Sequence, residues 1–311
     1  MSLQVAARTI APIFSLMVLG YLSRMRGVLR AGDERVFSSY LYYFGLPALL
    51  TVDISETALT REAVGLMVLN LAPMALVLLA LILVHLLLRF ERGTLYLLII
   101  VASFGSLGFY GLPFVTFALQ SIEAERLATL SVASINAVGF ILAVLVLEAY
   151  AGGASDAPAH RRVASSLARN PLILSIAVGM GLSAASLKIP VPIVSSLHLI
   201  GASTSPVAIF MLGVFLYGRD YRDLYEAAAL SLIRLVVLPF VAVAVCLFFG
   251  VPALEGTVMV VMYGTPLAVS MIVLSKRYGF REKTVSSVIL VSSLAAGVTM
   301  NLWLVLLDYI L

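Results

Sequence analysis

The chain is a succession of apolar runs, each about 20 residues long, which is the length a helix needs to cross the ~30 Å hydrocarbon layer of a membrane. These runs are too long for β-strands and do not alternate between apolar and polar residues. Hydrophobic residues make up 62% of the 311 positions and charged residues 12%. The sequence therefore predicts an all-α integral membrane protein with ten transmembrane helices, at roughly 4–23, 35–54, 63–88, 94–119, 126–150, 168–187, 191–216, 224–250, 254–275 and 284–310.

Lys and Arg residues gather in alternate loops. Fifteen of the 20 follow the first, third, fifth, seventh and ninth spans, whereas the loops between them hold only Arg61, Arg126 and Lys188. Loops rich in Lys and Arg stay on the cytoplasmic side of a membrane. We therefore expect a multi-pass protein of the cytoplasmic (inner) membrane with both chain ends outside. An even number of spans also requires both ends on one side, so the two arguments agree.

The two halves of the chain repeat one another in their prolines. Each half contains five spans, an odd number, so a second copy would enter the membrane from the opposite side, as in the inverted repeats of secondary transporters. We expect a first five-helix repeat at 1–150, a cytoplasmic linker at 151–167 and a second, inverted repeat at 168–311. The prolines recur in order at offsets of 159, 159, 166 and 153 residues: Pro12 and Pro171, Pro47 and Pro206, Pro73 and Pro239, Pro113 and Pro266.

The fourth and ninth spans are interrupted by glycine, proline and hydroxyl-bearing residues. A helix break frees carbonyl groups, and each unpaired carbonyl costs several kcal/mol in lipid unless protein or a water-filled cavity satisfies it. Breaks in both halves predict a shared cavity at the middle of the membrane, where helix ends hold a polar solute. The alternative is that these residues merely kink the helices. The candidate substrate-binding residues are Gly105, Ser106, Tyr110 and Pro113 in the fourth span, and Tyr263, Thr265 and Pro266 in the ninth.

Two further polar residues lie inside predicted spans. Arg234 is about eleven residues into the eighth span, where an arginine costs at least ~2.5 kcal/mol on insertion scales. It could attract an anionic substrate and bind its carboxylate through two hydrogen bonds, or it could be a structural residue that caps loose carbonyls. Asn136 in the fifth span is a candidate cavity residue, although such an asparagine also serves to bond a neighbouring helix.

Motifs for catalysis are missing from the sequence. There is no phosphate-binding loop, no HExxH, no Cys/His cluster and no GxSxG. We expect no enzyme activity, no cofactor, no bound metal and no nucleic-acid partner. A polytopic membrane protein built as an inverted repeat is expected to move a solute.

Several motifs, in order along nearly the whole chain, resemble those of the auxin efflux carrier family, which includes plant PIN-type carriers and bacterial malate and malonate carriers. They are APIFSLMVLGYL at 11–22, LPALL at 46–50, FGSLGFYGLPF at 104–114, NPLILSIAVGMGL at 170–182, SPVAIFMLGVFL at 205–216, RLVVLP at 234–239 and TPLAVSMIVLSKRYG at 265–279.

The resemblance implies spans 4 and 9 that are broken and cross at their prolines. It also implies a scaffold of spans 1, 2, 6 and 7, a transport domain of spans 3–5 and 8–10, elevator-like movement and a homodimer through the scaffold. The implied substrates are small organic anions, carboxylates above all. Ser106 stands where the family usually has asparagine, which puts auxin itself in doubt more than transport.

Two other functions stay open on the sequence. One is a sodium-coupled symporter of the related bile-acid fold, which would call for acidic or amide side chains at the crossing. The crossing here is Gly, Ser, Thr and Tyr, which argues against that symporter without excluding carbonyl ligands. The other is a membrane sensor subunit that keeps the carrier fold and transports nothing.

Overall fold

The computed structural model describes residues 3–56, 60–150, 168–169, 171–218 and 224–311. The helices of the first half are α1 (Leu3–Met25), α2 (Glu34–Tyr40), η1 (Leu41–Gly45), α3 (Leu46–Glu56), α4 (Arg61–Leu69), α5 (Ala72–Leu88), α6 (Arg92–Ser103), η2 (Leu107–Gly111), α7 (Leu112–Leu119), α8 (Ile122–Ser131), η3 (Val132–Asn136) and α9 (Ala137–Tyr150). Those of the second half are α11 (Pro171–Ala184), α12 (Val191–Ala202), α13 (Thr204–Leu216), α14 (Leu224–Leu232), η4 (Ile233–Val237), α15 (Leu238–Phe249), α16 (Ala253–Tyr263), α17 (Met271–Tyr278) and α18 (Glu282–Ile310).

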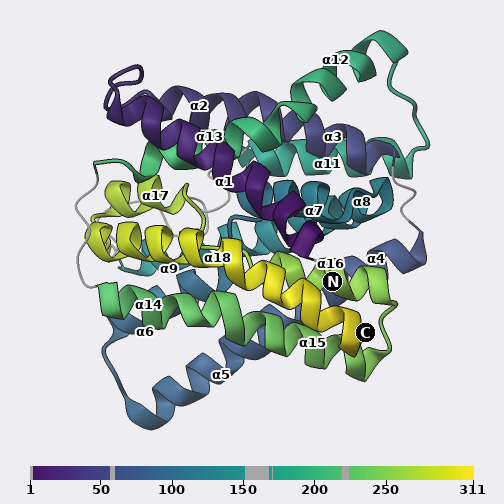
Figure 1. Ribbon diagram of the computed structural model, residues 1–311. Coiled ribbons are helices and arrows are strands. Elements are labelled where there is room, and N and C mark those ends of the chain that lie inside the picture. Colours follow the sequence, from purple (N-terminus) through teal and green to yellow (C-terminus); the bar gives the residue numbers. More distant parts are fainter. Residues whose placement is uncertain (1–2, 57–59, 151–167, 170, 219–223) are drawn as a thin grey trace.

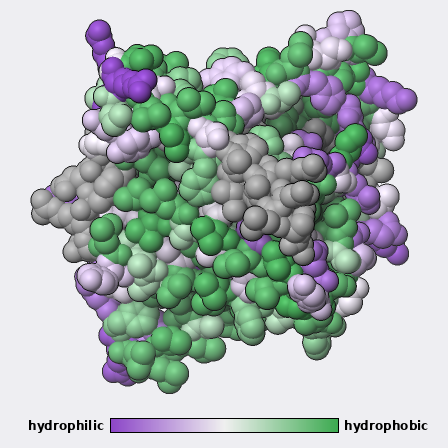
Figure 2. Space-filling view, viewed as in Figure 1, coloured by the Kyte–Doolittle hydropathy of each residue, from purple (hydrophilic) through white to green (hydrophobic). Residues whose placement is uncertain are grey.

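The predicted all-helical structure is confirmed for the described residues, and every predicted span coincides with a helix or with consecutive helices, with ends that differ by up to four residues. Five stretches are long and apolar enough to cross a membrane: Arg61–Leu88, Ile122–Tyr150, Val191–Leu216, Leu224–Phe249 and Glu282–Ile310. Shorter apolar helices fill most of the remaining predicted spans. Figure 2 shows hydrophobic residues over the middle of one face and hydrophilic residues towards two opposite edges. The number of crossings, the orientation and the inverted repeat stay predictions; the linker at 151–167 lies outside the described residues.

Three helices widen into a π-helical turn just before a Leu-Pro pair. The turns η1, η2 and η4 are each followed at once by Leu-Pro, at Leu46-Pro47, Leu112-Pro113 and Leu238-Pro239. A proline ring collides with the carbonyl four residues earlier in an α-helix. One extra residue in that turn moves the carbonyl away, so the helix accommodates proline without stopping.

The helices pack in two groups. The four-span group contains α1, α2–η1–α3, α11 and α12–α13, with its heaviest packing between α1 and α13 and between α11 and α3. The six-span group contains α4–α9 and α14–α18, including contacts of α6 with α9, α14 with α18, and α15 with α5 and α16. The groups meet where α1 contacts α7 and α18, α13 contacts η2 and α7, and α3 contacts α8. In Figure 1 the start of α1 lies near the end of α18.

Glycines allow the two tightest helix pairs of the four-span group to approach. A Cβ on Gly20 of α1 would lie 2.0 Å from the Phe210 carbonyl oxygen of α13, and one on Gly179 of α11 would lie 3.1 Å from the Thr51 carbonyl oxygen of α3. Gly20 and Gly179 are 159 residues apart, and so are Thr51 and Phe210. The two contacts therefore share the 159-residue offset of the first two proline pairs.

Candidate functional site

Two interrupted helices meet inside the six-span group. Helix α6 ends at Ser103 and the chain becomes helical again at Leu107, while α16 ends at Tyr263 and α17 begins at Met271. The segments between them, 104–106 and 264–270, pair in antiparallel fashion. The Ser106 N–H donates to the Pro266 carbonyl at 2.8 Å, and the Ala268 N–H donates to the Phe104 carbonyl at 3.1 Å. We call this paired region the crossover; its central pair is Gly105 and Leu267.

A third helix completes the hydrogen bonding of the crossover. The Leu267 N–H donates to Ser292 Oγ of α18 at 3.2 Å, and that hydroxyl donates in turn to the Val288 carbonyl at 2.6 Å. The crossover is thus held by main-chain bonds between the two breaks and by one serine from outside, as buried backbone groups require.

Arg234 lies fully buried against the crossover. It belongs to η4, and its guanidinium donates from Nε to the Thr265 carbonyl at 3.0 Å, from Nη2 to Thr265 Oγ1 at 2.8 Å, and from Nη1 to the Ala102 carbonyl at 3.1 Å. Ala102 is in the last turn of α6, and Thr265 follows the end of α16. Arg234 therefore caps the carboxyl-terminal ends of both interrupted helices, where carbonyl groups carry partial negative charge. Among the described residues, no carboxylate forms an ion pair with it.

Gly105 makes room for that guanidinium. A Cβ at this position would lie 1.8 Å from Arg234 Nη2 and 2.8 Å from Thr265 Oγ1. Only glycine, which has no side chain, fits between the arginine and the partner segment. The sequence marked Gly105, Thr265 and Arg234 separately, and the structure brings them into one cluster.

The amino-terminal ends of the resumed helices also lie at the crossover. Helix η2 begins directly after Ser106, and α17 begins after Ser270. Leu46 of α3, in the four-span group, packs on this region, because a Cβ on Gly108 would lie 3.0 Å from Leu46 Cδ2. The crossover thus borders on the neighbouring helix group.

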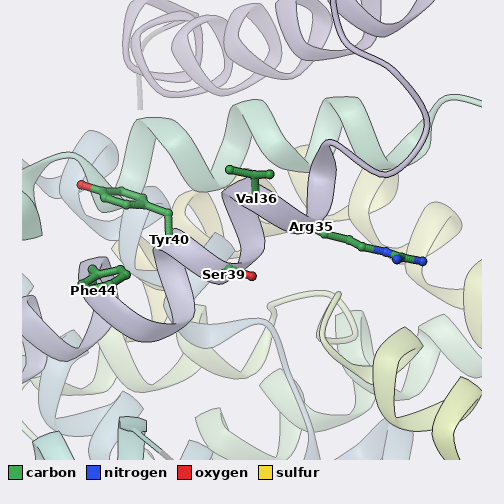
Figure 3. Close-up of a pocket in the computed structure, with 5 residues that line it drawn as sticks. All are labelled: Arg35, Val36, Ser39, Tyr40 and Phe44. Carbon is green, nitrogen blue, oxygen red and sulfur yellow. The ribbon is translucent and has the colours of Figure 1, made fainter.

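The crossover segments are packed inside the protein. Gly105, Ser106, Thr265 and Pro266 are all buried. Two hollows are described, and neither contains a crossover residue. One, of about 390 Å³, lies on a single face of α2 and η1, with Arg35 directed away from Tyr40 and Phe44 (Figure 3). The other is lined by His85, Leu86, Arg89, Phe90, Glu91 and Arg92. Leu46 of the four-span group lies against Gly108, next to these buried residues.

The remaining predicted site residues lie around the crossover rather than in it. Tyr110 of η2 donates its hydroxyl to the Ser293 carbonyl of α18 at 3.3 Å, and Tyr263 donates its hydroxyl to the Asn70 carbonyl between α4 and α5. Both phenols therefore join helices of the six-span group. Asn136 is half-buried at the end of η3, which contacts η2, and its amide has no hydrogen-bond partner among the residues described.

The prediction that the fourth span breaks at Pro113 is wrong. Pro113 is in the first turn of α7, which continues η2 without interruption, and the break lies earlier, at 104–106. The π-helical turn accommodates the proline ring, whereas Gly105 permits the extended pairing. Pro266 does lie in the break of the ninth span, as expected.

Sequence reasoning missed several residues that contact the interrupted helices. Some do so through main-chain atoms, and others because they are small. A Cβ on Gly139 of α9 would lie 2.2 Å from the Ser103 carbonyl oxygen, so this glycine lets α9 pack on the end of α6. Ser292, Ala102 and Leu46 were also missed. The small residues at 292, 293 and 297 were the available signal, since small side chains let membrane helices approach closely.

Comparison with known proteins identifies the family of the chain. The profile of the family described as "Membrane transport protein" matches residues 5–304. The chain is 23% identical over 299 residues to "Uncharacterized transporter MJ1031" of Methanocaldococcus jannaschii, which covers 94% of this chain and 95% of that protein. It is 23% identical over 309 residues to "Uncharacterized transporter YfdV" of Escherichia coli, covering 94% and 95%. It is 26% identical over 301 residues to "Putative malonate transporter" of Rhizobium meliloti, covering 94% and 92%.

The matched region includes both interrupted helices, Arg234 and the two helix groups. The family resemblance carried by the motifs is thereby confirmed. The chain belongs to the membrane transport protein family, the family of the auxin efflux carriers.

Proposed function

We propose that the protein is a secondary carrier that moves a small organic anion, a carboxylate of the malonate or malate type, across the cytoplasmic membrane. The observation that carries the proposal is the pairing of two interrupted helices around a buried cation. Such paired breaks lie at the substrate site of transporters built from inverted repeats. The malonate name of one relative supports a dicarboxylate.

The charges at the crossover favour an anion. Each helix end carries roughly half an elementary charge, negative at the carboxyl end and positive at the amino end. Arg234 offsets the two carboxyl ends of α6 and α16. The amino ends of η2 and α17 directly follow the two crossover segments and carry partial positive charge. A carboxylate that enters from the four-span side meets this positive potential.

The helix groups suit an elevator-like movement. In the proposed mechanism, the four-span group is the scaffold, corresponding to spans 1, 2, 6 and 7, and the six-span group carries the crossover. Glycine-mediated backbone contacts such as Gly20 with Phe210 favour a rigid scaffold. Separation of Leu46 from Gly108 opens the crossover to one side. Both chain ends outside and a homodimer through the scaffold complete the proposal.

The proposal is tested with purified protein in liposomes and labelled malonate, malate or indole acetate, each with and without a pH or sodium gradient. We expect saturable uptake of at least one carboxylate. A sensor subunit would instead be thermally stabilised by an anion and show no flux under any gradient.

A cysteine at Ser106 tests whether the crossover holds the substrate. The only native cysteine, Cys246, is buried and is first replaced by alanine. We expect a membrane-permeant thiol reagent to inactivate Ser106→Cys, and saturating substrate to slow that inactivation several-fold. Leu87→Cys, whose parent side chain is 82% exposed, is the control and is expected to show no protection. Equal rates with and without substrate at Ser106→Cys contradict a site at the crossover.

Leu46→Ala tests how the crossover is closed. Shortening this buried side chain removes the contact over Gly108, at a stability cost of ~2–5 kcal/mol. We expect faster thiol modification of Ser106→Cys in the Leu46→Ala background, because the gap between α3 and η2 is wider. Leu97→Ala, an equally buried leucine on α6, serves as the control for lost packing alone. Unchanged modification rates in Leu46→Ala rule out this leucine as the closing residue.

A further inference from the structure

A basic hollow of about 440 Å³ lies where α5 ends and α6 begins, at an edge of the molecule in Figure 1. Two of the side chains that line it, Arg89 and Arg92, are exposed. Neither has a carboxylate or another hydrogen-bond acceptor among the residues that the structure describes. The hollow therefore holds two positive charges that no part of the described chain neutralises.

The wall of the hollow also contains a buried nitrogen without a partner. His85 Nδ1 is buried, and no described residue forms a hydrogen bond with it. The His85 ring packs edge-on against Phe90, with ring centroids 4.7 Å apart, which holds it in the wall. Buried polar atoms are nearly always paired, so an unpaired one indicates a place where a further group binds.

The carboxylate in the wall already has a cation beside it. Glu91 Oε2 lies 3.5 Å from Arg281 Nη2, and Arg281 Nη1 lies 3.4 Å from Glu226 Oε1. Helix α6 begins at Arg92 without a side-chain cap, so its amino end adds partial positive charge. Arginine pairs well with the oxygens of a phosphate group. The hollow thus favours a phosphate over a cation or a neutral ligand.

Apolar surface that faces lipid continues directly from the hollow. The leucines at 86–88 are 64%, 82% and 72% exposed. They end the stretch Arg61–Leu88, which is long and apolar enough to cross a membrane. Arg89 and Arg92 therefore lie at the level where lipid head groups begin. An inorganic ion would not contact these leucines, whereas the acyl chains of a phospholipid can lie along them.

We propose that this hollow binds the phosphate of an anionic phospholipid. Arg89 and Arg92 contact the phosphate, His85 Nδ1 completes its hydrogen bonding on the head group, and the leucines at 86–88 contact the acyl chains. The loop is one of those whose arginines predict a cytoplasmic location, and the cytoplasmic surface of a membrane is the one where anionic lipids attract basic segments. The site is separate from the crossover and does not depend on which solute the protein moves.

The proposal is tested by thermal unfolding in detergent with added dioctanoyl phosphatidylglycerol, dioctanoyl phosphatidylcholine or inorganic phosphate. We expect phosphatidylglycerol at about ten times its Kd to raise the Tm by roughly 2–4 °C, and the other two to leave it unchanged. Equal stabilisation by phosphatidylcholine overturns the requirement for an anion. Equal stabilisation by inorganic phosphate overturns the assignment to a lipid.

Replacing both arginines locates the binding. The variant with Arg89→Gln and Arg92→Gln is expected to bind phosphatidylglycerol roughly 30-fold more weakly, about fivefold for each arginine. Arg92→Gln alone, with a fivefold loss, replaces it if the double variant does not fold. Arg61→Gln is the matched control, because Arg61 is an exposed arginine at the other end of the same stretch. Unchanged affinity in the double variant, or an equal loss in Arg61→Gln, overturns the proposal.

His85→Phe tests the unpaired nitrogen. This change removes the nitrogen and keeps an aromatic ring against Phe90. We expect a Tm without lipid equal to or above that of the parent, because no buried group is then left unpaired. We also expect weaker binding of phosphatidylglycerol. Parent-like affinity in His85→Phe overturns the part of the proposal that assigns His85 to the head group.

Discussion

Gly105→Ala is expected to abolish uptake, with a fall of roughly 100-fold, the effect that a displacement of about 1 Å has at a positioned site. The new methyl group would lie 1.8 Å from Arg234 Nη2, so either the guanidinium leaves its three oxygens or the two paired segments separate. Both outcomes expose buried carbonyls at the middle of the membrane. The measurements are initial uptake rate in liposomes and Tm in detergent.

Gly65→Ala is the matched control for this substitution. Gly65 is exposed on α4, and a Cβ there meets nothing within 4 Å. Alanine at an open helical position is favoured over glycine by up to ~1 kcal/mol. We therefore expect Gly65→Ala to transport normally and to be as stable as the parent protein or slightly more stable. Normal uptake by Gly105→Ala would show that the guanidinium does not have to lie against this glycine.

Gly213→Ala is expected to damage the fold itself rather than the crossover. A Cβ at Gly213 of α13 would lie 1.9 Å from the carbonyl oxygen of Met17 and 2.7 Å from its carbonyl carbon on α1. Backbone atoms cannot rotate away as a side chain can, so α1 and α13 must move apart. Overpacking of this kind costs ~1–3 kcal/mol or more, which corresponds to a Tm lower by roughly 2–5 °C or more.

The control for Gly213→Ala is Gly181→Ala on α11, where a Cβ meets no atom within 4 Å. We expect that variant to keep its Tm within a degree or two of the parent. The two variants are compared by thermal unfolding in detergent and by the yield of monodisperse protein. An unchanged Tm for Gly213→Ala would mean that the α1–α13 contact is looser than described.

The ranges of the helices followed from the sequence because hydrophobic length is a strong signal in a membrane protein. The two interrupted spans also followed, since FGSLGFYG and YGTP concentrate residues that weaken helices. The position of the break did not follow, because proline was given more weight than glycine. Pro113 is accommodated by the π-helical turn η2, while Gly105, which has no side chain to obstruct pairing, occupies the break.

From the sequence, Arg234 was either a substrate-binding residue or a structural residue that caps carbonyls. In the structure its guanidinium donates hydrogen bonds to the carbonyls of Ala102 and Thr265. Such an interaction cannot be predicted from spacing, because one partner is a main-chain atom 132 residues away. Tyr110 and Tyr263 were grouped with the crossover on proximity in sequence. Their hydroxyls instead bond to carbonyls of Ser293 and Asn70 on other helices, which a one-dimensional pattern does not reveal.

The crossover is joined through peptide groups of 104–106 and 266–268. Main-chain bonds of this kind do not depend on which side chains are present. The side chains around the crossover can therefore change during evolution while the two segments stay paired. Ser106 illustrates this, because its N–H and not its hydroxyl donates to the Pro266 carbonyl. The frame can therefore stay constant while the groups that would meet a solute change.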